Sequence, residues 1–456
     1  MTDDNTSESF GHTDSGNATR LIDNFGEDLR YCHQWGKWLV WDGMRFKPDE
    51  ADAITRKAMA ANKIFADIAE EFIEDYERAV EIRKWARTSE SSAKLDAAIK
   101  VAKSDPRVVV SPDDLDSNPW ALNVRNGTVN LRTGLLERHD RKALQTKLAE
   151  VNFAENARAP KWEQFLKVVT KGNKELESFL QQLVGYSLTG SVEQEIFMLL
   201  LGDGQNGKSK FVETIRFVLG DYAQQADFSS FLASDSDRVR NDIARMKGAR
   251  FISASEPNQG RNLDESLMKQ LTGGDRITAR YLHREFFEFD PTRKLWLVAN
   301  HMPGIEGTDD GIWRRIVVLP FSVTIPESER DTKLLGKLVA ESSGILNWAI
   351  QGCLDWQRNG LVVPDIVRGA IGGYRAEMDS MQRFIVEMCE TDPKAEVLVS
   401  DLYSAYHSWA EAESLRPKTT KQFATSLKAK GFPSARGTGG VRMRQGLSLV
   451  TEPALV

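Results

Sequence analysis

Residues 199–215 read LLLGDGQNGKSKFVETI and place a glycine-rich turn between an apolar run and an amphipathic one. Residues 202–209 match G-x-x-x-x-G-K-[ST] in full, and the flanking patterns predict a strand before the turn and a helix after it. The glycines let backbone N–H groups turn inward around phosphate oxygens, and the helix beginning near Lys208 adds its positive end. The pattern therefore predicts an α/β fold that binds ATP with Mg²⁺. The candidate nucleotide-binding residues are Gly202, Asp203, Gly204, Gln205, Asn206, Gly207, Lys208 and Ser209.

Within this loop two side chains have distinct expected roles. We expect Lys208 to reach the β- and γ-phosphates and Ser209 to bind Mg²⁺. A phosphate loop alone does not separate a kinase from a GTPase or a motor. The chain lacks an N/T-K-x-D-like base-reading segment and shows no second lid or acceptor site, which disfavours the GTPase and small-molecule kinase classes.

Two further strand-like runs end in polar residues. RFISASE ends at Glu256, a carboxylate placed to polarise the attacking water and to help hold Mg²⁺ through a water ligand. LWLVAN ends at Asn300, an amide suited to contact the γ-phosphate or to orient that water. The alternatives are a surface acid at a strand end for Glu256, and a turn former for Asn300 because HMPG follows.

A pair of arginines precedes another apolar run in GIWRRIVVLP, residues 311–320. An arginine delivered to the transition-state charge by a neighbouring subunit or partner is worth about 10³ to 10⁵ in rate, or roughly 4 to 7 kcal/mol. Arg314 or Arg315 is the candidate for this role, and the choice between them stays open. The alternative is a surface arginine pair.

The bulk composition is that of a globular protein. At about 150 residues per domain, 456 residues suggest roughly three units. No apolar run approaches the roughly 18 to 20 residues that cross a bilayer, so no membrane partner is expected. Residues 1–20 are polar and acidic, unlike a secretory signal, and are expected to be a disordered tail. The cysteines have neither disulfide nor zinc spacing, which favours a reducing cytoplasm, here that of a bacterial host cell: Cys32, Cys353 and Cys389.

The formal net charge of −6 argues weakly against a chain coated in nucleic acid, but the distribution of charge matters more than its sum. A segment near the C-terminal end carries basic residues that no acid interrupts. They are Arg416, Lys418, Lys421, Lys428, Lys430, Arg436, Arg442 and Arg444. This segment predicts a local basic face on an acidic protein.

Pattern changes along the chain predict three domains. An α+β domain over 21–155 combines a β-hairpin around Asp42-Gly43, helices over 51–104 and a second antiparallel element with turns at Asn126-Gly127 and Thr133-Gly134. Over 160–358 apolar runs alternate with helical segments, as in an α/β sheet. A separate domain over 380–450 contains two helices and the short β-wing RGTGGVRMRQG.

Residues 277–289 contain two β-prone runs joined near His283-Arg284. A hairpin tip that carries Arg280, His283 and Arg284 suits phosphate contact without base reading, and Tyr281 offers a stacking face. The alternative is an ordinary solvated hairpin.

The ordered set GDGQNGKS, FISASE, LTGGDRITARYLHREFFEF, WLVANHMP and GIWRRIVVLPF resembles the superfamily 3 helicase module of phage and plasmid primase-helicases, with satellite-phage and poxvirus relatives. This resemblance implies an AAA+-like fold, ring oligomers (usually hexamers), ATP bound between subunits, and a hairpin that contacts DNA in a central pore. Lys208 and Ser209 match the phosphate-loop positions, Glu256 the acidic end of the second motif and Asn300 the sensor asparagine. Ser255 stands where many members have a second acid, which puts direct metal ligation there in doubt.

The flanks carry a weaker resemblance. WLVWDGMRF and NVRNGTVNLRTG are similar to the domain that commonly precedes this helicase module, and residues 402–449 are similar to its winged-helix-like C-terminal domain. A helix-turn-helix with a basic wing implies phosphate-dominated, salt-sensitive duplex binding. A solvated basic surface or a subunit contact is the alternative.

The leading hypothesis is an ATP-dependent DNA helicase of a phage, prophage or plasmid replication system, which hydrolyses ATP, translocates on single-stranded DNA and unwinds forked DNA as a homo-oligomeric ring. No acidic triad of a primase is evident, so we expect a primase to be a separate protein. One alternative is a replication initiator whose ATP switch melts or marks an origin without processive unwinding. Another is a nucleotide-dependent structural or packaging component without a role in replication.

Overall fold

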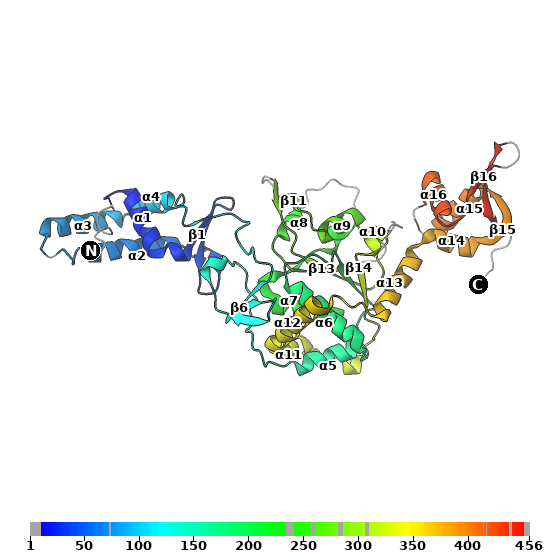
Figure 1. The fold of residues 1–456 in the computed structure, drawn as a ribbon, viewed down its shortest axis with the longest axis horizontal. Coiled ribbons are helices and arrows are strands. Elements are labelled where there is room, and N and C mark those ends of the chain that lie inside the picture. The colour runs from blue at the N-terminus through cyan, green and yellow to red at the C-terminus, as the bar shows by residue number, and fades with distance from the viewer. Residues whose placement is uncertain are drawn as a thin grey trace.

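The structure, a computed structural model, describes residues 11–72, 74–233, 241–256, 261–280, 286–305, 310–413, 415, 417–436 and 440–450. Three bodies follow one another along the long axis of the molecule, in the order of the chain (Figure 1). Each body has hydrophobic clusters of its own. No helix within the described ranges is both long and apolar enough to cross a membrane.

The N-terminal body combines helices with a small sheet of strand order β3-β2-β1-β4, in which β4 runs parallel to β1. Buried Leu21, Ile54 and Leu95 join three of its helices in one core. The predicted hairpin and the predicted helices are confirmed, and Asp42 accepts backbone hydrogen bonds in the hairpin turn. The elements are α1 Asp14–Phe25, β1 Leu29–Cys32, β2 Lys37–Trp41, β3 Phe46–Pro48, α2 Ala53–Ile68, α3 Tyr76–Ser89, α4 Ser92–Ala102 and β4 Val109–Val110.

The expectation that residues 1–20 form a disordered tail is wrong for the second half of this segment. Helix α1 begins at Asp14, and the Thr13 hydroxyl caps it by accepting a hydrogen bond of 3.0 Å from the backbone of Gly16. Ala18 is buried in the N-terminal core together with Leu21. Ala18, Leu21 and Ile22 are all buried on this helix, which the polar composition of the segment does not reveal. Residues 1–10 lie outside the described part.

A three-stranded meander connects the N-terminal and central bodies. Its strands are β5 Ala121–Val124, β6 Gly127–Asn130 and β7 Leu135–Glu137, and both pairs are antiparallel, as predicted from the two glycine turns. Leu122 and Val129 are fully buried in the same cluster as the helices of the central body. The boundary expected near residue 155 therefore does not coincide with a break in packing, because the buried face of the meander belongs to the central core.

The central body is a parallel sheet of strand order β14-β8-β13-β10-β9, which confirms the predicted α/β class. Alternate residues of β8 face different clusters, with Met198 on one side and Leu199 on the other. Both faces are covered, as expected for parallel strands such as β8 and β14 that are apolar along their whole length. The strands are β8 Phe197–Leu201, β9 Ala223–Gln225, β10 Phe251–Ser255, β13 Lys294–Ala299 and β14 Ile316–Pro320.

Helices cover the two faces of this sheet in separate groups (Figure 1). One face carries α5 Pro160–Val169, α6 Lys174–Leu188, α7 Lys208–Leu219, α11 Leu334–Ala340 and α12 Ser342–Asn359. The other carries α8 Asn241–Arg245, α9 Glu265–Thr272, α10 Asp310–Trp313 and the antiparallel pair β11 Ile277–Arg280 and β12 Phe286–Phe289. Helix α13 Asp365–Met378 buries Val367 and Tyr374 against the same body. The central core thus extends beyond the end expected at residue 358.

The C-terminal body has one core of its own, to which Phe384, Tyr406 and Phe423 contribute. Its helices and three-stranded sheet, of order β15-β17-β16, contain the two predicted helices and the predicted antiparallel pair. The elements are α14 Ser380–Met388, β15 Cys389–Leu398, α15 Val399–Ala412, α16 Thr420–Ala429, β16 Ser434–Arg436 and β17 Arg442–Leu449.

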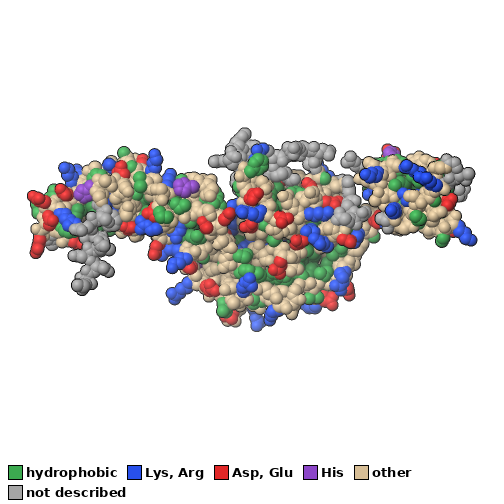
Figure 2. Space-filling view, turned by 45° about the horizontal axis from the view of Figure 1, so that its top comes forward, with side chains coloured by type: hydrophobic (Ala, Val, Ile, Leu, Met, Phe, Trp, Pro, Cys, Tyr) green, Lys and Arg blue, Asp and Glu red, His purple; other side chains and the backbone are tan. Residues whose placement is uncertain are grey.

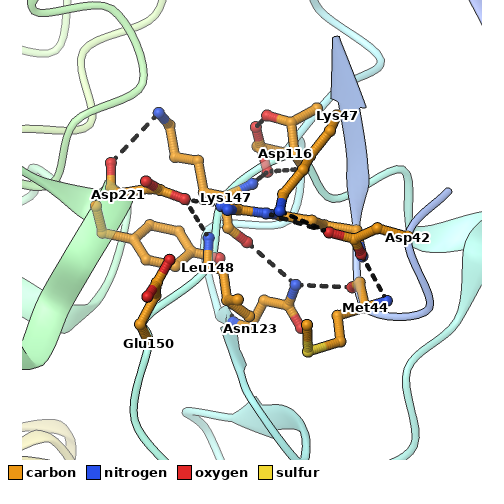
Figure 3. A network of polar contacts seen from close by, with 12 residues as sticks. Asp42, Met44, Lys47, Asp116, Asn123, Lys147, Leu148, Glu150 and Asp221 are labelled. Atoms are coloured by element: carbon orange, nitrogen blue, oxygen red, sulfur yellow. Dashed lines mark hydrogen bonds and ion pairs between the residues drawn. The ribbon is translucent and has the colours of Figure 1, made fainter. Parts of the chain in front are cut away.

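A polar network joins the N-terminal hairpin to the end of α7 (Figure 3). Asp221, just beyond α7, forms a close ion pair with Arg45 and accepts a hydrogen bond of 3.1 Å from the backbone of Leu148. Asn123 donates to the carbonyl of Met44 at 2.9 Å. The helix that follows the glycine-rich loop is thereby tied at its far end to the N-terminal body.

Candidate nucleotide-binding site

The glycine-rich loop connects β8 to α7, as the sequence predicts, and α7 begins at Lys208. Gly207 caps the helix with a φ of +89°, and a Cβ there would lie 2.6 Å from Val169. A Cβ on Gly202 would collide with the carbonyl oxygen of Phe321. Both positions therefore require glycine, and the first amides of α7 are left pointing out of the helix end, where an anion is stabilised.

Lys208 connects the loop with a distant strand end. Lys208 is only 3% exposed. Its ammonium donates hydrogen bonds to the carbonyl of Gly202, to Asn206 Oδ1 at 3.1 Å and to Asn300 Oδ1 at 3.2 Å. Burial lowers the pKa of Lys208. A buried ammonium whose acceptors are all uncharged oxygens is suited to a polyanionic ligand, which would supply the missing negative charge.

Glu256 follows β10, the strand next to β13, and its backbone N–H donates to the carbonyl of Val298 at 2.8 Å. Its Oε1 is buried and has no hydrogen-bond partner within the described residues. Burial raises the pKa of Glu256, and the charge of His301 partly opposes this. Lys208, Asn300 and Glu256 thus lie at the carboxyl edge of three adjacent strands, β8, β13 and β10.

The predicted Mg²⁺ ligands, Ser209 and Glu256, come from two different elements. Within the described ranges no group of three His, Cys, Asp or Glu side chains is arranged to hold a metal ion. Mg²⁺ keeps several waters and binds one or two protein oxygens together with substrate phosphates. Ser209 in the first turn of α7 and Glu256, whose buried Oε1 has no partner among the described residues, are the side chains that would hold it.

The predicted arginines lie at the amino ends of the parallel strands, whereas Lys208, Asn300 and Glu256 follow the carboxyl ends. Arg315 precedes β14, and its carbonyl accepts a hydrogen bond of 2.8 Å from Phe197, the first residue of β8. Five residue steps, or about 16 Å at roughly 3.3 Å per residue, separate Phe197 from Gly202 at the start of the glycine-rich loop. The structure therefore does not bring Arg314 and Arg315 together with Lys208 of the same chain.

The two arginines differ in exposure. The Arg315 side chain is 11% exposed and donates to Glu195 Oε2 at 2.6 Å and to the carbonyl of Gly311 at 2.9 Å. The Arg314 side chain is 65% exposed and lies 3.4 Å from the same Glu195 oxygen. Only Arg314 is accessible to a second molecule.

The predicted DNA-contacting hairpin is present as the pair β11 and β12, in which Arg280 opposes Phe286 at the end of the paired region. The guanidinium of Arg280 lies 4.7 Å from the ring centre of Phe286, which is 64% exposed. Tyr281, His283 and Arg284 lie outside the described residues.

Sequence reasoning missed several residues around the loop. The backbone of Ile325 donates to Gln205 at 3.0 Å, the amide of Asn206 donates to Phe321 at 3.0 Å, and Arg330 contacts Gln205 Oε1. Glu195, which holds both arginines, was also missed. Ile325, Arg330 and Glu195 lie outside the motifs, and the only available signal was an acid just before the first strand of the sheet.

The fold and the site define a parallel α/β protein in which a glycine-rich loop leads from a buried strand into a helix. Residues 18–171 match the family described as D5 N terminal like, and residues 200–315 match a family of unknown function, DUF5906. A "Putative helicase" of Acanthamoeba polyphaga mimivirus is 30% identical over 321 residues, which are 65% of this chain and 33% of the relative. These matches confirm the predicted resemblance to the primase-helicase family.

Two further viral proteins are similar at lower identity. A "Putative helicase" of Frog virus 3 is 27% identical, over 50% of this chain and 26% of the relative. A "Putative primase" of African swine fever virus is 24% identical, over 65% of this chain and 34% of the relative. The chain thus spans about a third or less of the length of these relatives.

Among solved structures, the A form of the apo C-terminal region of NrS-1 matches with a TM-score of 0.52 and 8% identity, covering 96% of this chain and 100% of that one. At this identity the likeness concerns the fold alone.

Proposed function

We propose that this protein is an ATP-driven DNA helicase of a viral or plasmid replication system, and that it works as a ring of identical subunits. The observation that carries this proposal is the division of the predicted site between two edges of one sheet. Lys208, Asn300 and Glu256 converge at the carboxyl edge, whereas the exposed Arg314 lies at the amino edge. An active site assembled from these groups needs a second copy of the chain.

The chemistry of each part follows from its environment. ATP with Mg²⁺ would be held by the loop amides, Lys208 and Ser209, and would supply the transferred phosphoryl group and the metal charge. The buried Glu256 carboxylate orients and polarises the attacking water, and Asn300 fixes the position of the Lys208 ammonium and of that water. Arg314 from a neighbouring subunit neutralises charge that develops in the transition state. This arrangement supports an AAA+-like mechanism.

Two surfaces are suited to nucleic acid. The hairpin β11–β12 presents Arg280 beside the exposed ring of Phe286, a combination that contacts phosphates and stacks on bases without reading sequence. Lys and Arg side chains also gather on the C-terminal body (Figure 2). The succession of α15, α16 and the β16–β17 pair supports a winged-helix-like module.

The predicted basic face is smaller than the sequence suggests. Lys430 is paired with Asp379 at 2.5 Å, and Arg444 is 3% exposed and donates to the carbonyls of Phe432 and Ala424. Arg416 lies outside the described residues. The remaining candidates for phosphate contact are Lys418, Lys421, Lys428, Arg436 and Arg442.

Strand displacement on forked DNA tests the proposal. Lys208→Ala is expected to reduce both ATPase activity and displacement to background while the fold persists, because the ligand loses its buried ammonium. Lys210→Ala is the matched control, since Lys210 lies on the same helix but pairs with Glu213 at the surface. Retained turnover in Lys208→Ala would remove this loop from the active site. DNA-stimulated ATPase activity without displacement would favour the initiator alternative instead.

A further inference from the structure

Glu195 has an unusual backbone conformation just before the first strand of the central sheet. Its φ is +50°, although it is not glycine, and its N–H closes a turn to the carbonyl of Val192 at 2.9 Å. A non-glycine residue in this region costs free energy and persists only where its surroundings impose the conformation. The contacts of the Glu195 side chain are therefore the first place to look for what holds this backbone conformation.

The side chain of Glu195 bridges two adjacent guanidinium groups. Its Oε2 lies 2.6 Å from Arg315 and 3.4 Å from Arg314, both of which precede β14. Strands β8 and β14 are neighbours, and Phe197 bonds to the carbonyl of Arg315, so backbone and side chain together fix this corner of the sheet. The carboxylate also offsets the repulsion between two like charges that the sequence places side by side.

The two ion pairs serve different purposes. The Arg315 side chain is 11% exposed and also donates a hydrogen bond to the carbonyl of Gly311, so its position is fixed. Arg314 is 65% exposed, and an ion pair as exposed as this contributes only about 0–1 kcal/mol to stability. That contact is weak enough to be exchanged for a stronger anion, yet it keeps the guanidinium close to one position. Restricting a charged group before it meets its ligand lowers the entropy lost on contact.

We propose that Glu195 is a positioning residue, which holds Arg315 and presents Arg314 to the phosphates of a nucleotide bound by a second copy of the chain. This inference rests on the proposed function, because it assigns the donor side of that shared site. No bond is made or broken at Glu195.

The first test compares Glu195→Gln with Glu193→Gln in the whole 456-residue chain. Glu193 lies on the same loop, is exposed and forms side-chain hydrogen bonds with Ser191 and Gln194 but no ion pair with either arginine among the described contacts, so it is the matched control. We expect the kcat of the DNA-stimulated ATPase to fall by about tenfold to a hundredfold in Glu195→Gln, less than the roughly 10³-fold loss when an arginine finger is removed. The KM for ATP is expected to stay within about twofold, because the nucleotide loop lies at the other edge of the sheet.

The conservative variant Glu195→Asp keeps the charge on an arm one methylene shorter and is expected to have an intermediate kcat. Aspartate also tolerates the left-handed backbone region better than most residues, so folding is not at risk. Thermal unfolding midpoints of all three variants are expected to lie close to that of the native protein. Equal kcat values for Glu195→Gln and Glu193→Gln would overturn the assignment.

Subunit mixing separates positioning from a general structural role. Glu195→Gln subunits keep an intact nucleotide loop, and Lys208→Ala subunits keep intact arginines and Glu195. Mixed assemblies are therefore expected to regain activity that neither variant has alone. The double variant Lys208→Ala/Glu195→Gln is expected to restore an Arg314→Ala protein about tenfold to a hundredfold less well than Lys208→Ala does.

Absence of rescue by Lys208→Ala subunits would reject the donor role of Glu195. The proposed function fails by a different result, namely full ATPase activity of Lys208→Ala alone. The two hypotheses are thus distinguished by different variants.

Discussion

The ammonium of Lys208 lies 3.2 Å from the amide oxygen of Asn300, although 92 residues separate them in the chain. Strands β8 and β13 are adjacent and parallel, with Ala299 opposite Leu201, so the residues that follow both strands meet at one edge of the sheet. This contact turns two separate sequence patterns into one candidate site.

Replacing Asn300 by alanine tests that contact. Without the amide the Lys208 ammonium loses one of its three acceptors, and the attacking water loses a positioning group. We expect the kcat of ATP hydrolysis to fall by about 10²-fold, as when a preorganised hydrogen-bonding group is removed, with ATP binding retained. Asn359→Ala removes a surface amide that pairs with Asp355 and is expected to behave as the native protein. A normal kcat for Asn300→Ala would leave Asn300 as a turn residue.

Burial of the Glu256 carboxyl predicts that the free energy of unfolding depends on pH. Because burial raises its pKa, the folded protein binds this proton more tightly than the unfolded chain does. Stability without nucleotide is therefore expected to fall as the pH rises from the unfolded to the folded pKa. Glu256→Gln removes this effect, so the variant is expected to melt at a higher temperature than the native protein at pH 8. The difference is expected to vanish below about pH 4, where the carboxyl is protonated in both states.

The same variant is expected to bind ATP without hydrolysing it, since an amide does not polarise the attacking water as a carboxylate does. Glu163→Gln, an exposed substitution on α5, is the control for both measurements. A melting difference that does not change with pH would contradict the buried, ionisable carboxylate.

Arg314 and Arg315 are expected to give opposite phenotypes. Arg314→Ala should lower the DNA-stimulated ATPase rate by about 10³-fold or more. The denaturation midpoint should stay unchanged, because the Arg314 side chain is 65% exposed. Arg315→Ala should destabilise the fold by about 1–2 kcal/mol in denaturant unfolding, because it breaks hydrogen bonds to Glu195 and Gly311. Loss of stability in Arg314→Ala, with normal stability in Arg315→Ala, would reverse this assignment.

The hairpin is expected to act in DNA contact and not in hydrolysis. The double variant Arg280→Ala/Phe286→Ala removes the cation and the exposed ring that face each other at its described end. Basal ATPase activity should persist, whereas affinity for single-stranded DNA and strand displacement should fall, with stacking alone worth about 1–3 kcal/mol per base. The control is Arg276→Ala, at the base of the hairpin, where the arginine pairs with Asp290 at 3.5 Å. Unchanged displacement in the double variant would reject the hairpin assignment, as it would for His283→Ala/Arg284→Ala.

Local patterns predicted most elements but not their limits. Hydrophobic runs and glycine turns were sufficient for the parallel sheet, the N-terminal hairpin and the meander, because period and turn chemistry are local properties. The helix at residues 14–25 was missed because its apolar face is short and its flanks are polar. The predicted end of the N-terminal domain differs from the observed one because Leu122 and Val129 pack on helices of the central body. The positions of those helices in space are not a local property of the sequence.

The sequence by itself determined the phosphate loop and the strand ends that carry Glu256 and Asn300, because these depend on residue type at fixed spacing beside apolar strands. Only the tertiary structure decided which of these groups meet and which do not. The order of parallel strands brings Asn300 to Lys208 and leaves both arginines at the other edge, and packing of the turn before β8 buries Arg315 while Arg314 stays exposed. Strand order and burial arise from contacts between residues far apart in the chain, which no single motif contains.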